Sequence, residues 1–351
     1  MAPAESSDDL PQPEASSQAA RIKAENAAAL QNPRPAAAES HGPLVTLTEE
    51  NDDLANNGDQ HYTQGIRLSY SLGENRTPYW ATRVAETLPD LGMKMEAVRF
   101  GLAAGQNMYT PKNIFTPSMV RTDRPYAGWL YLGTFLQRRG LTSRETPVLD
   151  NIELDLGIIG PESLAEETQT WWHALGGWIV PLGWHNQLKS EPGLVLKYDR
   201  QWKFSPSQPE AGWGLEFIPH AGVSLGNVQT FAVAGGVLRA GYNLPDDFGT
   251  QNIDSLATQA GGRTLNTHCV GGYFFVGLDG RAVARNAFLD GNLWRHSLSV
   301  EKEPLVADFR AGGVLAFRHF DLALSFVQRS REFKMQTRND QIGRASCRER
   351  V

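Results

Sequence analysis

The feature that most constrains this chain is a set of long segments in which apolar and polar residues alternate. In GIRLSYSL, Ile66 and Leu68 share one face while Arg67 and Ser69 share the other, and NIELDLGII and FDLALSF repeat the pattern. Strand side chains point to opposite faces in turn, so this alternation predicts strands with one apolar and one polar face. Eleven such strands are predicted, near residues 44–50, 61–72, 96–106, 126–137, 150–157, 193–205, 211–226, 229–242, 270–284, 304–317 and 320–335.

The length of these segments favours a membrane barrel over a soluble sandwich. A sandwich gives the same alternation but uses strands of about 5–6 residues, whereas a tilted strand needs about 9–11 residues to cross a bilayer. Trp129, Tyr131, Trp202 and Trp213 lie near predicted strand ends, as an interfacial aromatic girdle requires. We therefore predict an all-β chain that forms an antiparallel transmembrane β-barrel.

The two ends of the chain differ in composition from the part between them. Residues 1–41 are rich in Ala, Ser and Glu and are predicted to be a disordered tail. No signal peptide is visible there. Residues 42–340 are predicted to form the barrel. The last eleven residues, QIGRASCRERV at 341–351, break the strand pattern and resemble a translated sequencing adapter, so they are interpreted as a scar that replaces a lost final strand.

Charge and composition exclude several other classes of protein. The formal net charge is −6 and no basic run occurs, which excludes a nucleic-acid partner. No stretch of about 18 or more apolar residues is present, which excludes a spanning helix. The two cysteines are too few for a disulfide framework or a thiolate metal site. The G-x-S-x-G match around Ser224 lies within a strand pattern and lacks the strand, turn and helix that a hydrolase nucleophile needs.

One helix is predicted in GPESLAEETQTWWHALGG, between turns at Gly160 and Gly177. Ser163 and Glu166 have the spacing of a capping box at its start. Gln169 and His173 are four residues apart and so share a face of the helix. His173 is either a structural histidine near a helix C-terminus or a general base.

A second polar cluster, TEENDDLANNGDQHYTQG, precedes a strongly apolar strand. Its Asn, Asp and Gly residues are typical of a solvated hairpin turn. Its oxygen-bearing side chains are also the ligands that calcium prefers. The spacing of the cluster does not match an EF-hand loop.

Several stretches together, in order, resemble the outer-membrane lipid A 3'-O-deacylases, the LpxR-like barrels. They are ENDD at Glu50, HYTQG at His61, GQNMYTP at Gly105, DRPYAGWLYLG at Asp123, GIIGPESLAEETQTWWH at Gly157 and GWHNQLKSEPGL at Gly183. The resemblance covers about residues 44–336. It implies a twelve-stranded outer-membrane barrel that removes the 3'-linked acyloxyacyl chain of lipid A with Ca²⁺ and a histidine base.

The resemblance also implies the residues of the site. The catalytic residues would be His173, Gln169, Asn51 and Asp52. Calcium would be held by Asn51, Asp52, Thr63 and, as the acidic residue after the histidine, Glu191. Lipid A phosphates would be bound by Lys112, Arg121 and Arg124.

The resulting expectation is a carboxylic ester hydrolase that acts on lipopolysaccharide in the bacterial outer membrane, as a monomer among outer-membrane lipids. A runner-up is an outer-membrane phospholipase with the same base and calcium ion. A second alternative is a non-enzymatic porin or structural barrel, although Arg67, Glu153, Asp155, Lys197 and Asp199 could fill its lumen with paired charges.

Overall fold

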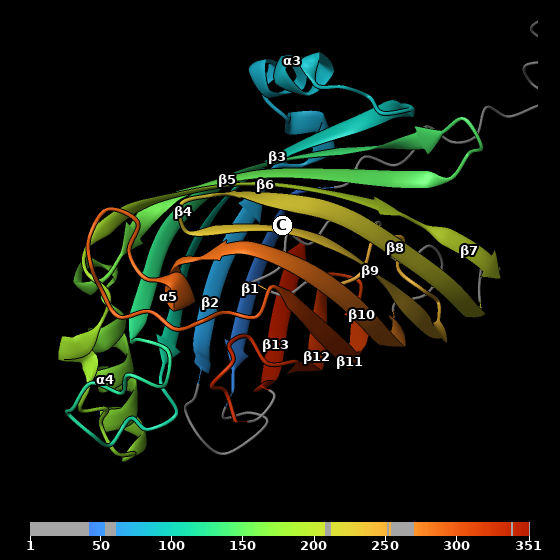
Figure 1. Ribbon diagram of the computed structural model, residues 1–351. Coiled ribbons are helices and arrows are strands. Elements are labelled where there is room, and N and C mark those ends of the chain that lie inside the picture. The colour runs from blue at the N-terminus through green and yellow to red at the C-terminus, as the bar shows by residue number, and fades with distance from the viewer. Residues whose placement is uncertain are drawn as a thin grey trace, which may run out of the picture. The chain divides into compact units, whose positions relative to one another are not determined.

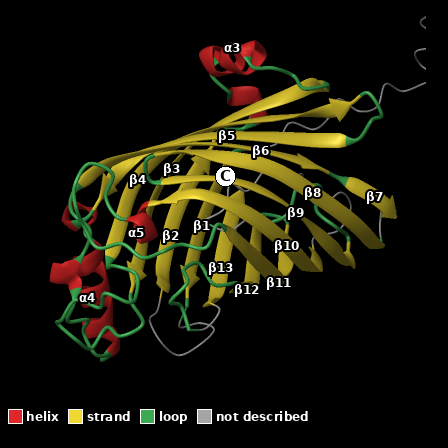
Figure 2. Ribbon diagram, viewed as in Figure 1, coloured by secondary structure: helices red, strands yellow, loops and turns green. Residues whose placement is uncertain are grey.

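The computed structural model describes residues 42–52, 61–207, 212–250, 253, 270–337 and 340–350, and the predicted tail at 1–41 lies outside them. The described residues form one large sheet with a few short helices (Figures 1 and 2). The strands are β1 (Leu44–Asn51), β2 (His61–Ser71), β3 (Met93–Thr110), β4 (Ala127–Thr142), β5 (Pro147–Ile159), β6 (Glu191–Trp202), β7 (Phe204–Ser207), β8 (Trp213–Gly226), β9 (Gln229–Tyr242), β10 (Val270–Asn286), β11 (Leu305–Phe317), β12 (Phe320–Arg329) and β13 (Asp340–Arg350).

The sheet closes on itself. Its thirteen strands follow the order β6-β5-β4-β3-β2-β1-β13-β12-β11-β10-β9-β8-β7, and β6 also pairs with β8. The short β7 lies beside β8 at the edge of this ring. The described chain therefore forms a closed barrel of twelve antiparallel strands with β7 as an extra strand. The predicted fold is confirmed, and a strand occurs in each of the eleven predicted segments. The segment predicted at 320–335 ends as a strand at Arg329, and the one predicted at 193–205 is divided between β6 and β7.

The prediction that the final strand is lost is wrong. β13 pairs with β12 on one side and with β1 on the other, and so completes the ring. Its buried Arg344 lies 3.4 Å from Glu50, and its Arg348 contacts the carboxylate of Asp321. The inward arginines contact carboxylates that are distant in sequence. The segment considered alone therefore does not show the pattern of a strand. The interpretation of the segment as a scar concerns its origin and stays a prediction.

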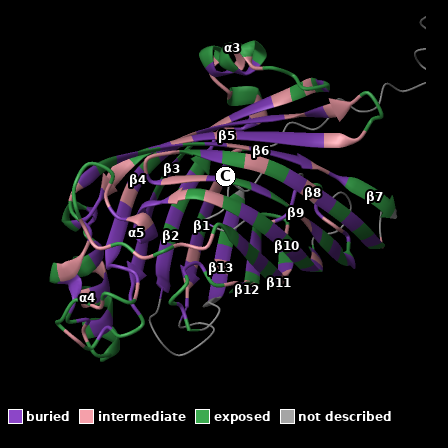
Figure 3. Cartoon of the chain, in the orientation of Figure 1, coloured by how far each residue is buried: buried purple, intermediate pink, exposed green. Residues whose placement is uncertain are grey.

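Burial alternates along the strands, as Figure 3 shows for β8 to β12. Large apolar side chains such as Leu68, Leu132 and Leu324 are exposed on the outer face. The polar side chains of the same strands face the lumen and are buried. This division matches a barrel whose wall faces lipid and whose inside is polar.

Two of the four predicted girdle residues point the other way. Trp129 and Tyr131 are buried in the lumen, where their rings stack at 5.7 Å. Trp213 is exposed and packs edge to face on Tyr242. Position near a strand end is therefore not enough to place an aromatic side chain on the outer face.

The lumen is filled with paired charges. Arg67 makes two bonds of 2.9 Å to Glu153, and Lys197 lies 2.8 Å from Asp155. His220 lies between Asp199 and Asp279, at 2.9 and 2.8 Å. A buried charge is tolerated when it is paired in this way. These contacts confirm the expected charge pairing in the described part of the lumen.

The segment after β9 adds to this filling. Asp247 contacts Arg239 near the end of β9 and lies 2.8 Å from Arg348 of β13. Farther along, the amide of Ile253 donates to Glu50 of β1 at 2.7 Å. The described part of this segment therefore lies inside the barrel and contacts both strands of the β1–β13 seam.

The helices are short and lie at the strand ends. They are α3 (Tyr79–Thr87), α4 (Ala165–Gly176) and α5 (Ala287–Asp290), together with single 3₁₀ turns at Glu74–Arg76, Pro161–Ser163 and Trp184–Asn186. The sequence predicted α4 but not α3 or α5. Figure 1 shows α3 and α4 at opposite ends of the barrel.

Among the described residues, no helix is both long enough and apolar enough to cross a bilayer.

Candidate active site

The end of the barrel next to α4 collects the predicted oxygen donors. Asn51 is the last residue of β1, and its register partner on β2 is Gln64. Asp52 follows directly, and its amide donates to the Thr63 carbonyl at 3.3 Å. The Asp52 and Thr63 side chains are both buried. The first hairpin therefore brings all three predicted donors to one rim, while residues 53–60 lie outside the described chain.

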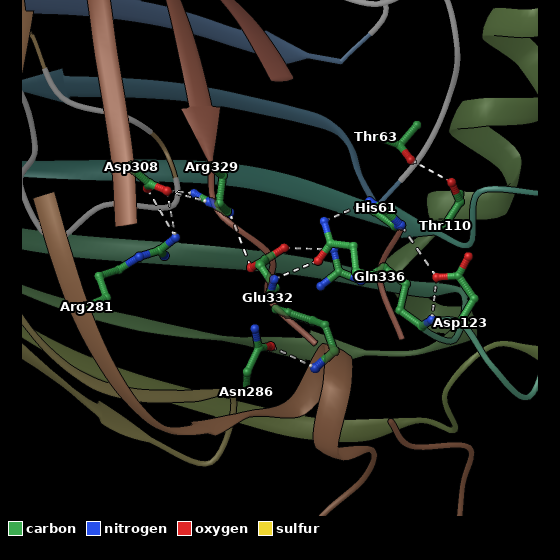
Figure 4. Close-up of polar contacts among 12 residues, drawn as sticks. His61, Thr63, Thr110, Asp123, Arg281, Asn286, Asp308, Arg329, Glu332 and Gln336 are labelled. Atoms are coloured by element: carbon green, nitrogen blue, oxygen red, sulfur yellow. Dashed lines mark hydrogen bonds and ion pairs between the residues drawn. The ribbon is translucent and has the colours of Figure 1, made fainter. Parts of the chain in front are cut away.

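A β-bulge sets the position of Thr63. The pairing of β2 with β3 shifts between Tyr62 and Gln64, which leaves Thr63 out of the ladder. The Thr63 hydroxyl lies 2.7 Å from the hydroxyl of Thr110, the last residue of β3 (Figure 4). Bulges next to active sites commonly re-aim one side chain in this way. Thr110 was not predicted as a site residue, although it lies within the GQNMYTP stretch.

Helix α4 packs directly on the wall of the barrel. Ala165 at its start clusters with Met108 of β3 and with Trp184. A Cβ at Gly128 of β4 would come within 1.9 Å of the Ser163 hydroxyl and 2.4 Å of Ala165. The close approach of the helix to the wall therefore requires glycine at position 128.

The predicted capping box at the start of α4 is not formed. The N-cap residue is Leu164, in the left-handed region at φ 59°, and no side chain caps the helix. Ser163 is instead buried against the barrel wall in the space left by Gly128. Tertiary packing has overridden the local capping signal. The predicted end of the helix is confirmed, because Gly177 at φ 69° donates to the last carbonyls.

The turn before α4 is tied to the strand that follows it. Glu162 accepts a hydrogen bond from the hydroxyl of Ser190, and this bond holds the pKa of the Glu162 carboxyl below its usual range. The side chain of Gln106 on β3 donates to the carbonyl of Ser163 at 2.7 Å. The start of α4 is therefore bound to the barrel on two sides.

Strand β3 links the helix to the oxygen donors. Met108, which packs under α4, and Thr110, which bonds to Thr63, are two residues apart and so share a face. That face is the outer one, because it also carries the exposed Leu102. The start of α4 and Thr63 of the first hairpin therefore both contact the outer face of β3, near its end.

The imidazole of His173 is oriented by the chain that follows α4. Its Nδ1 lies 2.7 Å from the Ile179 carbonyl, and its ring packs edge to face on Trp178 at 6.0 Å. A carbonyl oxygen only accepts, so Nδ1 carries the proton and Nε2 has the lone pair in the neutral ring. On the same helix face, the Gln169 side-chain oxygen accepts from the Trp184 indole at 2.7 Å. Both predicted residues are buried.

The donor set at the rim suits a calcium ion in its chemistry. Asp52 offers a carboxylate, Asn51 an amide oxygen, and Thr63 and Thr110 hydroxyl oxygens, all of them the hard oxygen ligands that Ca²⁺ takes. No group of three His, Cys, Asp or Glu side chains with metal-binding geometry occurs in the described ranges. Among the described residues, a metal at this rim would be held by this mixed set of oxygens.

Glu191 lies apart from this donor set. It is the first residue of β6, and its side chain is on the inner face. Its carboxylate accepts three bonds of 3.0–3.2 Å from the amides of Leu293 and Trp294. These contacts make Glu191 an anchor for the segment after α5, so its predicted role as a metal ligand does not fit the structure.

The three predicted phosphate-binding cations separate into two groups. Lys112 and Arg121 are exposed on the β3–β4 connection, where a headgroup could reach them. Arg124 is fully buried in the lumen, 3.3 Å from Glu332 and 5.0 Å from the centre of the Tyr109 ring. A side chain without exposed surface cannot contact a lipid headgroup outside the barrel, so Arg124 does not fit its predicted role.

The barrel defines the class of the protein. A closed ring of strands with an apolar outer wall and a charged lumen is the architecture of an integral outer-membrane protein. The family described as "Outer membrane protein LpxR" matches residues 24–350. The chain belongs to this family, and the predicted recognition and outer-membrane location are confirmed.

A solved structure of this family has the same fold. LpxR from Salmonella typhimurium matches with a TM-score of 0.69 at 19% identity, over 88% of this chain and 100% of that one. The beta domain of the Bordetella autotransporter Brka matches with a TM-score of 0.40 at 11% identity, over 88% and 99% of the two chains. No curated protein sequence matches this chain.

Proposed function

We propose that this protein is a lipid A 3'-O-deacylase, a carboxylic ester hydrolase of the outer membrane. The observation that carries the proposal is the position of α4. A helix with a buried, oriented histidine packs on the outer wall, at the end of the strand whose Thr110 bonds to Thr63 of the oxygen-donor rim. Membership of the LpxR family supports the same activity.

His173 acts as the general base in this mechanism. Its Nδ1–H is held by the Ile179 carbonyl, so its Nε2 removes a proton from the attacking water. The same nitrogen then gives this proton to the sugar oxygen as its bond to the acyl carbon breaks. Gln169, fixed by the Trp184 indole, supports this face of the helix. A bound Ca²⁺, held by Asn51, Asp52 and Thr63, would stabilise the negative charge that develops on the ester oxygen.

The surface around the site supports a lipid substrate. Trp171, Leu175, Trp178 and Ile179, on α4 and the turn after it, are all more than half exposed. They continue the apolar outer wall, where Leu132 is 70% exposed. Exposed apolar surface of this kind marks a contact with lipid or with a partner. Acyl chains can pack here while Lys112 and Arg121 bind the phosphates.

An outer-membrane phospholipase remains the runner-up, because the same base and calcium ion would hydrolyse a glycerophospholipid ester. The two substrates differ in their headgroups. Lipid A carries two phosphates on a disaccharide, so exposed cations beside the site favour it. A porin is disfavoured by the paired charges and the chain segment that occupy the lumen.

The test is His173→Ala, with His185→Ala as the matched control. His185 is an exposed histidine just after the helix, and its contact is with Asn186. Purified barrels are incubated with a mixture of lipid A and glycerophospholipid, with and without a calcium chelator, and the products are identified by mass spectrometry. We expect wild type and His185→Ala to release the 3'-acyloxyacyl chain only when calcium is present, and His173→Ala to be inactive. Intact lipid A together with released lysophospholipid would favour the phospholipase.

A further inference from the structure

One buried histidine has no part in the mechanism above. His61 is the first residue of β2, and its side chain has almost no exposed surface. Its backbone φ is 64°, in the left-handed region. This conformation is costly for a side chain such as histidine and persists only where surrounding contacts enforce it. Such positions concentrate at functional sites.

Three side chains contact the His61 ring, and two of them, Gln336 and Asp123, are drawn in Figure 4. Nδ1 of His61 lies 3.3 Å from the amide nitrogen of Gln336, and Nε2 lies 3.6 Å from the Asp123 carboxylate. The ring of Phe333 packs edge to face at 5.4 Å. The Gln336 side-chain oxygen accepts from the Glu332 amide, which directs its NH₂ group toward His61. In the neutral ring Nδ1 therefore accepts, and the Nε2 proton points toward Asp123.

These partners belong to two connections at the same end of the barrel. Asp123 accepts from the amides of Lys112 and Arg124 and so closes the connection between β3 and β4. Gln336 and Phe333 lie between β12 and β13. The imidazole therefore joins both connections to the start of β2.

The bulge lies immediately after this junction. His61 and Tyr62 pair with β3, then the register shifts and Thr63 leaves the ladder to bond Thr110. We propose that His61 is a positioning residue: held by Asp123 and Gln336, it locks the β2 bulge that turns the Thr63 hydroxyl toward Thr110 and the candidate calcium site. This inference rests on the proposed function for the identity of the ion.

The test removes either the His61 imidazole or one of the side chains that hold it. His61→Ala deletes the imidazole, and Gln336→Ala deletes one of its partners without changing β2. His220→Gln is the control, because it disturbs a buried histidine in the lumen that contacts Asp199 and Asp279 instead. Heat-modifiable gel mobility selects folded barrels, and calorimetric titration with calcium chloride in detergent gives the affinity.

We expect His61→Ala to weaken calcium binding about tenfold, the usual cost of losing a residue that orients a metal ligand. Gln336→Ala should act in the same direction, and the double variant should be no worse than His61→Ala. His220→Gln should lower thermal stability and leave the affinity at the wild-type value. Wild-type affinity in His61→Ala, or equal weakening in His220→Gln, would overturn the positioning role.

Hydrogen exchange of the amides at 61–66 separates this inference from the proposed function. A locked bulge predicts protected amides in the wild type and faster exchange in His61→Ala, with or without calcium. If the wild type binds no calcium, the proposed function fails and exchange alone decides the role of His61. Equal protection in the two proteins would then overturn it.

Discussion

The contact between α4 and the barrel wall can be tested at Gly128. An added Cβ at this position would lie 1.9 Å from the Ser163 hydroxyl and 2.4 Å from the Ala165 Cβ. Both distances are far below van der Waals contact, so Gly128→Ala must push the helix outward. Overpacking of this kind costs about 1–3 kcal/mol, which corresponds to a roughly 5- to 150-fold lower population of the docked helix if docking is only marginally favourable. We expect lipid A hydrolysis to fall by up to that factor.

The assay is the initial rate of acyl-chain release from lipid A, with Gly280→Ala as the matched control. Gly280 is an exposed strand glycine on β10, and an added Cβ there would meet no atom closer than 3.9 Å. Both variants should keep the heat-modifiable mobility of a closed barrel, because the Cβ added at position 128 lies on the outer face of the barrel. Removing the Ser163 side chain in Gly128→Ala/Ser163→Gly should restore part of the rate. A Gly128→Ala protein with wild-type activity would show that the docked position of α4 is not needed for catalysis.

Two further predictions concern the lumen. Arg67→Ala leaves Glu153 with one cationic partner fewer, and removal of one member of a buried pair costs about 3–5 kcal/mol of stability. We expect a lower urea concentration at the midpoint of unfolding in urea-gradient gels. An unchanged midpoint would contradict this. Burial alone would raise the pKa of Asp247, but Arg239 and Arg348 hold it below the ordinary 3.8. A depressed carboxyl pKa stabilises the fold above the unfolded value and loses that effect as the pH falls. Asp247→Asn should therefore destabilise the barrel at pH 7 and flatten the loss of stability below about pH 4, and parallel acid-unfolding curves would contradict this.

The sequence was sufficient to predict the strands because alternation is a local property. Outward Leu and Phe residues alternate with inward residues that are often polar, and the strands repeat this alternation often enough to be recognised. β13 lacked that signal, because its inward arginines are matched by Glu50 and Asp321 across the sheet and its outward residues include Ala345 and Cys347. Pairing with residues far along the chain cannot be inferred from one segment.

The site was predicted less completely than the fold. Local spacing placed Gln169 and His173 on one helix face, and the family resemblance indicated the oxygen donors. Neither could predict that Arg124 and Glu191 face the inside of the barrel, because the face of a residue beside a loop depends on where the strand begins. His61 was missed for a related reason. Its partners Asp123 and Gln336 lie in the β3–β4 and β12–β13 connections, and no local sequence pattern predicts how these connections fold.

The chain segment inside the barrel has a consequence for biogenesis. Asp247 holds Arg348 on the last strand, and Ile253 holds Glu50 on the first, so the segment bridges the two strands that meet when the cylinder is completed. Because both closing strands contact this segment, it must lie inside the barrel for the contacts of the completed β1–β13 pair to form.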